Sequence, residues 1–236
     1  MSAVWSDSAP GVDERDAGAA VKAVASTPAW FGAIVAAALS AAGLTHSTEA
    51  AAAPKTSVDA KIGYCEDCHG PAGQGYYGYF PIPRLAGQQT QYIKNQLQAF
   101  IEHRRTNNIM FNVAHVLSPA MISALAERFR SFNPPPFGGA PRAFVATGKE
   151  IFQDGLPDAN IAACAACHGP EAYGHDQIPR LAGQLYPYLV RALNNWGAER
   201  GQHTAQPDTS ATMLPIAHSL NKRQMEAVAA YVSTLK

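Results

Sequence analysis

The chain has 236 residues, which suffices for one or two domains. Its 18 basic and 18 acidic residues give a formal net charge of zero, so we expect no nucleic-acid partner. The four cysteines all fall in a motif that occurs twice, and two duplicated small domains are therefore expected.

The first patterned segment is an apolar run at residues 29–44, followed by small residues that a signal peptidase accepts. The run is shorter than a membrane span, which needs about 20 residues. We therefore interpret residues 1–52 as a cleaved signal region, with an uncleaved anchor as the alternative. Residues 1–28 are acidic where a signal should be positive, so we hypothesise that translation begins near Val21. N-terminal sequencing of the unprocessed precursor tests this, and a start at Met1 would disprove it.

Residues 65–70 read C-E-D-C-H-G, and residues 164–169 repeat them as C-A-A-C-H-G. The C-x-x-C-H pattern is the attachment signature of c-type haem, because two thiols on one helical turn bond the same porphyrin and the histidine faces its iron. Disulfides, zinc and redox-active thiols are the alternatives, and a histidine after both pairs favours haem over them. We therefore expect two covalently bound haem c groups, held by Cys65, Cys68, Cys164 and Cys167.

The heptapeptide I-P-R-L-A-G-Q follows each motif, at residues 82–88 and 178–184, and leads into apolar residues at helical spacing. Its arginine, Arg84 or Arg180, either neutralises a haem propionate or is a solvated surface residue. Three tyrosines precede the first copy, at Tyr76, Tyr77 and Tyr79. They either shield a haem edge, pack between the halves or, more simply, cap a glycine-rich loop with amphipathic rings.

Each half then offers a methionine in a matching frame, Met110 in the first and Met213 in the second. A methionine is more often core filler than a ligand, and Met121 and Met225 on the following helices are interpreted as filler. Met110 and Met213 keep the frame of the repeat and precede those helices. This favours them as axial iron ligands opposite the motif histidines.

Histidines are the rival ligands. His115 and His218 each follow the methionine by five residues, so ligation of iron by two histidines is the alternative. Their ordinary interpretation is a buried or half-buried histidine with a hydrogen-bond partner. His103, His175 and His203 have no counterpart in the repeat and are predicted to lie on the surface.

Helix starts are predicted at four N-cap candidates. Ser57 and Thr147 precede the two motifs, and Ser118 (with Pro119 behind it) and Asn221 precede the terminal helices.

Residues 133–141 are rich in proline and read as a semi-rigid linker between an N-terminal domain, residues 53–132, and a C-terminal domain, residues 142–236. Relative to the first domain, the second has seven extra residues around residues 201–204.

The paired C-x-x-C-H-G motifs, the P-x-L-A-G-Q segments and the methionine-centred segments together resemble the dihaem class I cytochromes c of the cytochrome c4 type, over residues 58–236. The resemblance implies an all-α fold of two tandem cytochrome c domains, each wrapped around one covalently bound haem. It also implies electron transport in the bacterial periplasm, commonly towards a terminal oxidase. The implied axial ligands are His69 with Met110 and His168 with Met213. The carbonyls of Pro83 and Pro179 would accept hydrogen bonds from the two imidazoles.

We therefore expect a non-enzymatic periplasmic carrier of single electrons. It would take them from a quinol-oxidising complex or a dehydrogenase and deliver them to a terminal oxidase or reductase. The alternative is the cytochrome subunit of a periplasmic dehydrogenase complex. A dihaem peroxidase needs an open or openable iron, which a methionine in each half argues against. Membrane association is expected only if the N-terminal segment stays uncleaved.

Overall fold

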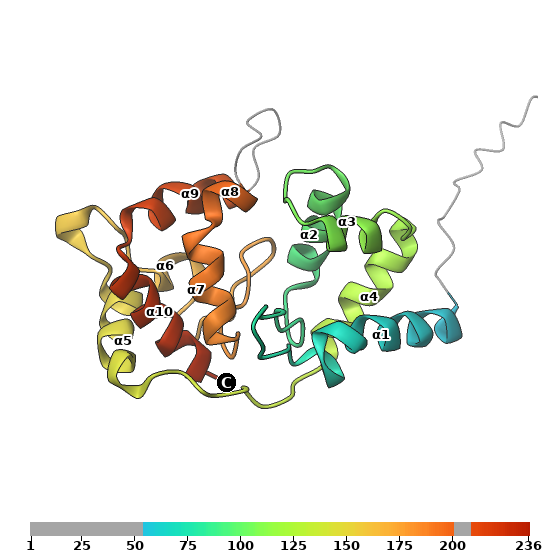
Figure 1. Cartoon of the computed structure of the whole chain (residues 1–236), viewed down its shortest axis with the longest axis horizontal. Helices are drawn as coiled ribbons and strands as arrows, with labels where there is room; N and C mark the ends of the chain where they lie inside the picture. Colours follow the sequence, from blue (N-terminus) through green and yellow to red (C-terminus); the bar gives the residue numbers. More distant parts are fainter. Residues whose placement is uncertain (1–53, 201–208) are drawn as a thin grey trace, which may run out of the picture. The chain divides into compact units, whose positions relative to one another are not determined.

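The computed structural model describes residues 54–200 and 209–236, which form α-helices and short 3-10 turns (Figure 1). Extended backbone in these residues pairs only as isolated bridges, so the predicted all-α fold is confirmed. The predicted signal region and the predicted insertion around residues 201–204, with His203, lie outside the described residues. Within the described ranges, no single helix has the length and apolar composition to cross a membrane. Two consecutive helices, Asn108–Ala114 and Pro119–Ser131, meet that test only as a pair bent by 112°.

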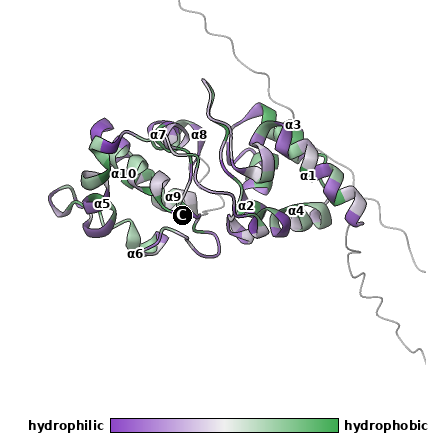
Figure 2. Cartoon of the chain, turned by 90° about the horizontal axis from the view of Figure 1, so that it is seen from below, coloured by the Kyte–Doolittle hydropathy of each residue, from purple (hydrophilic) through white to green (hydrophobic). Residues whose placement is uncertain are grey.

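The first half contains four α-helices in its described residues: α1 (Lys55–His69), α2 (Thr90–Ile101), α3 (Asn108–Ala114) and α4 (Pro119–Ser131). Helices α1 and α2 pack on α4. One hydrophobic core contains Ile62 of α1, Ile93 of α2 and Leu125 of α4. Helix α4 carries both hydrophobic and hydrophilic residues (Figure 2), and its buried residues recur at helical spacing, at Ile122, Leu125, Ala126 and Phe129. Met121 packs against the same core, as expected of filler.

The second half contains six in its described residues: α5 (Val145–Asp154), α6 (Ala165–His168), α7 (Tyr186–Asn194), α8 (Trp196–Glu199), α9 (Thr209–Ser219) and α10 (Lys222–Thr234). Helix α10 lies beside α5 (Figure 1) and packs on it and on α7, over a core that includes Ile151 and Phe152. The two helices are so close that a side-chain carbon at Gly148 would collide with the carbonyl of Ala227. Met225 is buried in a smaller cluster, again as expected of filler.

Two predicted N-caps are confirmed. The Ser118 hydroxyl accepts a hydrogen bond from the backbone N–H of Met121 at 3.2 Å, with Pro119 as the first helical residue. Asn221 accepts from the N–H of Gln224 at 3.0 Å, and the Gln224 side chain accepts from the N–H of Asn221 at 2.8 Å. The second half therefore closes with a complete capping box, which supplies two bonds where Ser118 supplies one.

The other two predicted N-caps are wrong. Helix α1 begins at Lys55, so Ser57 lies inside its first turn, and the serine hydroxyl donates to the Pro54 carbonyl at 2.7 Å. Helix α5 begins at Val145 because a 3-10 turn, Arg142–Phe144, leads straight into it. A residue can cap a helix only where the backbone is still extended, and Thr147 is already helical.

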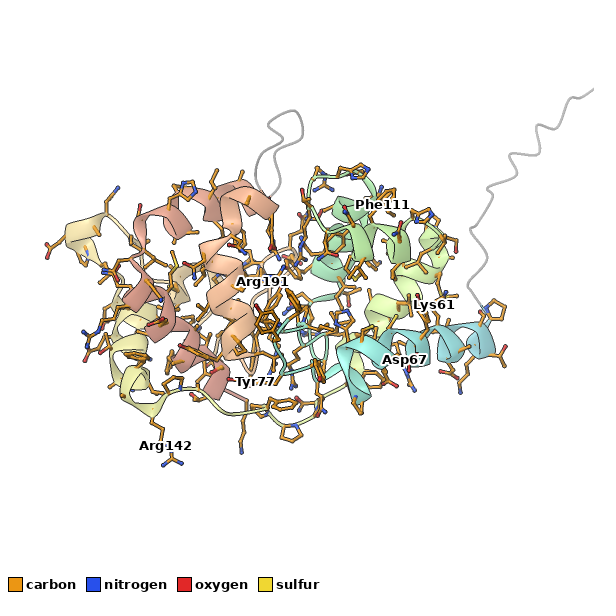
Figure 3. All side chains as sticks on the ribbon, in the orientation of Figure 1. Lys61, Asp67, Tyr77, Phe111, Arg142 and Arg191 are labelled. Atoms are coloured by element: carbon orange, nitrogen blue, oxygen red, sulfur yellow. The ribbon has the colours of Figure 1, made fainter. Side chains whose placement is uncertain are left out.

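Residues 132–141 connect the halves without regular secondary structure. The guanidinium of Arg84 donates to the carbonyls of Pro134 at 2.7 Å and Pro135 at 3.2 Å. Tyr77, labelled in Figure 3, stacks on Phe137 with the ring centroids 5.8 Å apart. Both contacts attach this segment to the first half. The domain boundaries at residues 132 and 142 stay a prediction.

Candidate functional site

The first motif occupies the last turn of α1. Cys65 is half-buried, Cys68 is exposed and His69 is buried. Gly70 ends the helix with φ +75°, and a side-chain carbon there would lie 2.5 Å from the carbonyl oxygen of Gly75. The motif needs glycine at this position because the chain turns back here towards the heptapeptide.

The second motif lies on a short helix of its own. Cys164 is the N-cap of α6 and is half-buried, Cys167 is exposed and His168 is buried. Gly169 ends α6 with φ +78°, close to the value at Gly70. The two motifs therefore share the same final turn although the segments before them differ.

No disulfide joins any of the four cysteines, so the disulfide alternative is wrong. Burial raises the pKa of the Cys65 thiol to about 11, and it raises the pKa of Cys164 to about 11 as well. The direction of this shift is opposite to the lowered pKa that activates the thiolate of a redox-active pair. Among residues 54–200 and 209–236, no three His, Cys, Asp or Glu side chains gather so as to hold a metal ion.

The motif histidines are held by the carbonyls that the resemblance predicted. His69 Nδ1 lies 2.8 Å from the Pro83 oxygen, and His168 Nδ1 lies 3.0 Å from the Pro179 oxygen. A carbonyl can only accept, so each Nδ1 carries the proton and each Nε2 keeps a lone pair. Burial lowers the pKa of both histidines, although the carbonyls oppose it, and this favours the neutral form of each imidazole. Two attaching thiols and one neutral imidazole with a lone pair fit a covalently bound haem in each half.

The candidate methionines lie on corresponding helices. Met110 is half-buried on α3, whose N-cap residue Asn107 accepts the backbone N–H of Met110 at 2.9 Å. Met213 is half-buried on α9. Helix α3 packs on α2, and α9 packs on the counterpart of α2, α7. Both methionines therefore precede the terminal helices, as predicted. The sequence reasoning did not predict that each methionine itself lies in a helix.

The paired histidines are not buried, so that part of their interpretation is wrong. His115 and His218 are both exposed. His115 has a hydrogen-bond partner, the carbonyl of Phe111, at 3.0 Å from Nδ1, and its ring stacks on Phe111. His103 and His175 are exposed, as predicted for surface residues.

The arginines of the heptapeptides turn back onto their own segments. Arg84 is 4% exposed, so its interpretation as a solvated residue is wrong, and its Nε donates to the Ala86 carbonyl at 3.2 Å. Arg180 Nε donates to the Ala182 carbonyl at 3.1 Å, and its guanidinium lies over the ring of Tyr173. The predicted role in neutralising propionates stays a prediction.

A positively charged cluster joins the halves. The hydroxyl of Tyr188 accepts from Arg105 of the first half at 2.9 Å and from Arg200 of the second at 3.2 Å. Burial by itself would raise the pKa of Tyr188, but the charges of the two arginines outweigh it, so the pKa is lowered. The backbones of Arg105 and Arg200 also pair directly in an isolated bridge.

Sequence reasoning missed the last residue of each heptapeptide. Gln184 Oε1 accepts the backbone N–H of Arg84 at 2.8 Å, and its Nε2 donates to the Arg84 carbonyl at 3.0 Å. Gln88 makes the same pair of bonds to Arg180, at 2.7 and 3.0 Å. The available signal was that glutamine is the seventh identical position in both copies.

Comparison with known proteins agrees with this geometry. The cytochrome c family model matches residues 145–236. Cytochrome c-552 of Acidithiobacillus ferridurans is 35% identical over 210 residues, which cover 87% of this chain and 86% of the relative. The thiosulfate dehydrogenase electron acceptor of Stutzerimonas stutzeri is 33% identical over 174 residues, covering 72% and 78%. The cytochrome c4 structure from Acidithiobacillus ferrooxidans matches with a TM-score of 0.61 and 36% identity, covering 72% of this chain and 98% of that one.

A duplicated C-x-x-C-H turn, a buried histidine held by a proline carbonyl in each half, and relatives that match over most of their length lead to one assignment. The fold is all-α, two covalently bound haem c groups are its cofactors, and redox proteins are its partners. The chain belongs to the cytochrome c4 family and is a dihaem electron-transfer cytochrome.

Proposed function

We propose that this protein is a periplasmic carrier that accepts and releases single electrons and has no catalytic activity of its own. When bound, each haem supplies an iron that changes its charge by one. The side chains around it would fill both axial positions and leave none for a substrate. The observation that carries the proposal is the repeated bond from a buried histidine to a proline carbonyl, 2.8 Å in one half and 3.0 Å in the other.

The proposed ligand sets follow the repeat. The cysteines of each motif attach the haem, and the histidine presents Nε2 to the iron because Nδ1 is bonded to the proline carbonyl. A methionine thioether as the second iron ligand would favour the reduced iron and raise the potential. The proposed sets are Cys65, Cys68, His69 and Met110 for the first haem, and Cys164, Cys167, His168 and Met213 for the second.

Replacing the methionines one at a time tests the ligand sets. Met110→Ala should abolish the sulfur-to-iron charge-transfer band of one haem and lower its potential, and Met213→Ala should do so for the other. Met121→Ala is the matched control, because Met121 packs in the core and should leave both spectra unchanged. Unchanged spectra in the first two variants would rule out methionine, and changed spectra in His115→Ala or His218→Ala would then identify histidine as the ligand.

The absence of catalytic activity has its own test. Two closed irons predict that the reduced protein neither binds carbon monoxide nor turns over peroxide at neutral pH. Carbon monoxide binding by the wild-type protein would contradict the closed sets and favour a peroxidase.

For the donor, we propose a periplasmic dehydrogenase, with thiosulfate dehydrogenase as the first candidate. The relative named thiosulfate dehydrogenase electron acceptor supports this choice, since it matches 72% of this chain. A terminal oxidase or reductase would then receive the electrons, and a quinol-oxidising complex is the alternative donor. Mixing the oxidised protein with thiosulfate and a purified thiosulfate dehydrogenase should reduce both haems. No reduction there, with rapid reduction by a quinol-oxidising complex, would reverse the choice. Stable co-purification with the dehydrogenase would favour a subunit over a shuttle.

The proposed location is the periplasm, because covalent haem attachment in bacteria takes place outside the cytoplasm and the apolar run at residues 29–44 suits an export signal. Cell fractionation with detection of covalent haem tests it. Recovery in the membrane fraction would point to an uncleaved N-terminal anchor, and recovery in the cytoplasm would contradict the proposal.

A further inference from the structure

One peptide group in the first half is hydrogen-bonded on both of its sides. Its carbonyl, on Pro83, accepts the Nδ1 proton of His69 at 2.8 Å. Its N–H, on Arg84, donates to Oε1 of Gln184 in the second half at 2.8 Å. His69, this peptide group and Gln184 therefore form one continuous chain of hydrogen bonds. All three residues are buried, with exposures of 8% for His69, 4% for Arg84 and 7% for Gln184, so water does not compete for these bonds.

The second half contains the equivalent chain of hydrogen bonds, with the roles of the two halves exchanged. The peptide group between Pro179 and Arg180 accepts the Nδ1 proton of His168 at 3.0 Å and donates to Oε1 of Gln88 at 2.7 Å. Each motif histidine is thus connected, through a single peptide group, to a glutamine of the other half. No titratable group lies between the histidine and the glutamine in either chain of bonds.

Each glutamine amide is held in one orientation. Gln184 Nε2 donates to the Arg84 carbonyl at 3.0 Å, and Gln184 Oε1 also accepts the N–H of Leu185 at 3.0 Å. Gln88 makes the matching bonds, including one from the N–H of Gln89 at 2.9 Å. Exchanging the amide oxygen and nitrogen would set donor against donor and acceptor against acceptor. The oxygen therefore faces the N–H of the histidine-bound peptide.

We propose that Gln184 tunes the haem bound by His69, and that Gln88 tunes the haem bound by His168, across the boundary between the halves. Hydrogen bonds in a chain polarise one another. An acceptor on the peptide N–H makes the carbonyl oxygen at the other end more negative, so it draws the Nδ1 proton more strongly and Nε2 becomes a better electron donor. A better donor stabilises oxidised iron, so each glutamine lowers the potential of the opposite haem.

Gln184 and Gln88 can act in this way only if His69 and His168 bind iron as proposed above. Both glutamines are then positioning residues, because each acts through a peptide group without touching the haem. The arrangement gives each half a direct influence on the electron affinity of the other. That influence is set by the docking of the halves and is independent of the charges on the haems.

The test uses the full-length, haem-loaded protein with Gln184→Met, which keeps the length of the side chain and removes its amide. Redox titration with separate NMR assignment of the haems should show an upward shift in the potential of the His69 haem, with a smaller change at the other. The Nδ1 proton of His69 should move to lower chemical shift in the reduced protein, because its hydrogen bond weakens. Gln88→Met should give the reverse pattern, with the shift at the His168 haem.

Gln89→Met is the matched control. Gln89 Nε2 also crosses the boundary, to the carbonyls of Tyr173 at 2.8 Å and Gly174 at 3.0 Å, and touches neither histidine-bound peptide. The crossed pattern in Gln184→Met and Gln88→Met, absent from Gln89→Met, supports the proposal. Equal shifts at both haems, no shift, or the same shifts in Gln89→Met would overturn it. If the methionine variants fail to fold, Gln184→Asn and Gln88→Asn withdraw the amide by one carbon and should give the same crossed pattern.

The two proposals fail in different ways. If iron ligation by methionine and histidine is wrong, the charge-transfer band will already be insensitive to Met110→Ala and Met213→Ala. If that band responds and the crossed potentials are absent, ligation stands and tuning by the glutamines is disproved.

Discussion

The two halves bring the same cysteine–histidine turn to a proline carbonyl by different routes. In the first, α1 runs unbroken for 15 residues from Lys55 to His69. In the second, α5 stops at Asp154, the chain turns through Gly155 and a bridge between Leu156 and Ile161, and the four-residue α6 follows. The resulting geometry of the two motifs is nevertheless similar, with histidine-to-carbonyl distances of 2.8 and 3.0 Å. The final turn and its carbonyl partner therefore define the site, and the helix before them serves as support.

The supports differ most in how closely they pack. Gly148 of α5 lies against the backbone of α10, where a side-chain carbon would collide with the Ala227 carbonyl and lie 2.9 Å from Cβ of Tyr231. Gly63 of α1 has nothing within 4 Å of the same position. A glycine is thus a packing requirement in the second half and a conformational weakness in the first.

Alanine at these two glycines should give the largest contrast. Gly148→Ala should destabilise the protein by about 3 kcal/mol, because overpacking forces α5 and α10 apart. Gly63→Ala should stabilise it by about 1 kcal/mol through better helix propensity. Guanidinium unfolding followed by circular dichroism measures both. Equal effects would show that the two supports do not differ in packing.

The turn that interrupts the second support comes next in expected size. Gly155 has φ +75°, and a side-chain carbon there would lie 2.5 Å from the Ile161 carbonyl oxygen, so Gly155→Ala should cost about 2 kcal/mol. Gly138 has φ +78° and open space around it, so Gly138→Ala isolates the backbone cost, about 1 kcal/mol. Thermal unfolding separates the two. A Gly155 variant no worse than the Gly138 variant would mean that the turn relaxes without cost.

The caps of the terminal helices sharpen the same comparison. Asn221→Ala removes a capping box and should cost about 1 kcal/mol, whereas Ser118→Ala removes one 3.2 Å bond and should cost about half as much. Ser131→Ala is the control, since that hydroxyl donates to the Arg128 carbonyl at the far end of α4 and caps no helix start. The denaturant midpoint should be lowest for Asn221→Ala, higher for Ser118→Ala and highest for Ser131→Ala. A reversed order would contradict the capping-box argument.

The smallest expected effect is a dependence of stability on pH. The lowered pKa of Tyr188 means that, below the ordinary tyrosine value of about 10, the unfolded chain holds this proton more tightly than the folded protein. Stability should therefore gain from ionisation as pH rises towards 10, and lose that gain as pH falls through the folded pKa. Comparing denaturant midpoints of wild type and Tyr188→Phe from pH 7 to 10 measures this. A difference between them that does not change with pH would show that the arginines do not act on the phenol.

Features determined by a few neighbouring residues could be predicted from the sequence. The motif turns and the caps at Ser118 and Asn221 each depend on groups within one short segment. The two histidine-to-carbonyl bonds were expected from the family resemblance alone. Ser57 failed because the backbone at Pro54 already starts α1, and Thr147 failed because a 3-10 turn leads into α5. The type of residue at a predicted helix start does not show whether the backbone before it is already helical.

Contacts between segments far apart in the chain could not be predicted in the same way. Arg84 was assigned either to a haem propionate or to solvent, and it is bonded to two linker carbonyls, 50 and 51 residues away in sequence. Gln88 and Gln184 bond across 92 and 100 residues. Their identity in both copies marked them as important, but a repeat cannot show whether its copies face one another. The ordinary interpretation of His115 and His218 was a buried or half-buried histidine, and both are exposed.

The attachment of the linker to Arg84 has a consequence for how strongly the halves must bind each other. With the carbonyls of Pro134 and Pro135 bonded to the first half, the remaining connection to α5 is a short tether. Short tethers keep two binding surfaces at an effective concentration on the order of millimolar. The reciprocal glutamine bonds can therefore be individually weak and still hold the halves together. The same surfaces on separate molecules would meet at far lower concentrations. Association of the two halves within one chain is therefore favoured over association between halves of different chains.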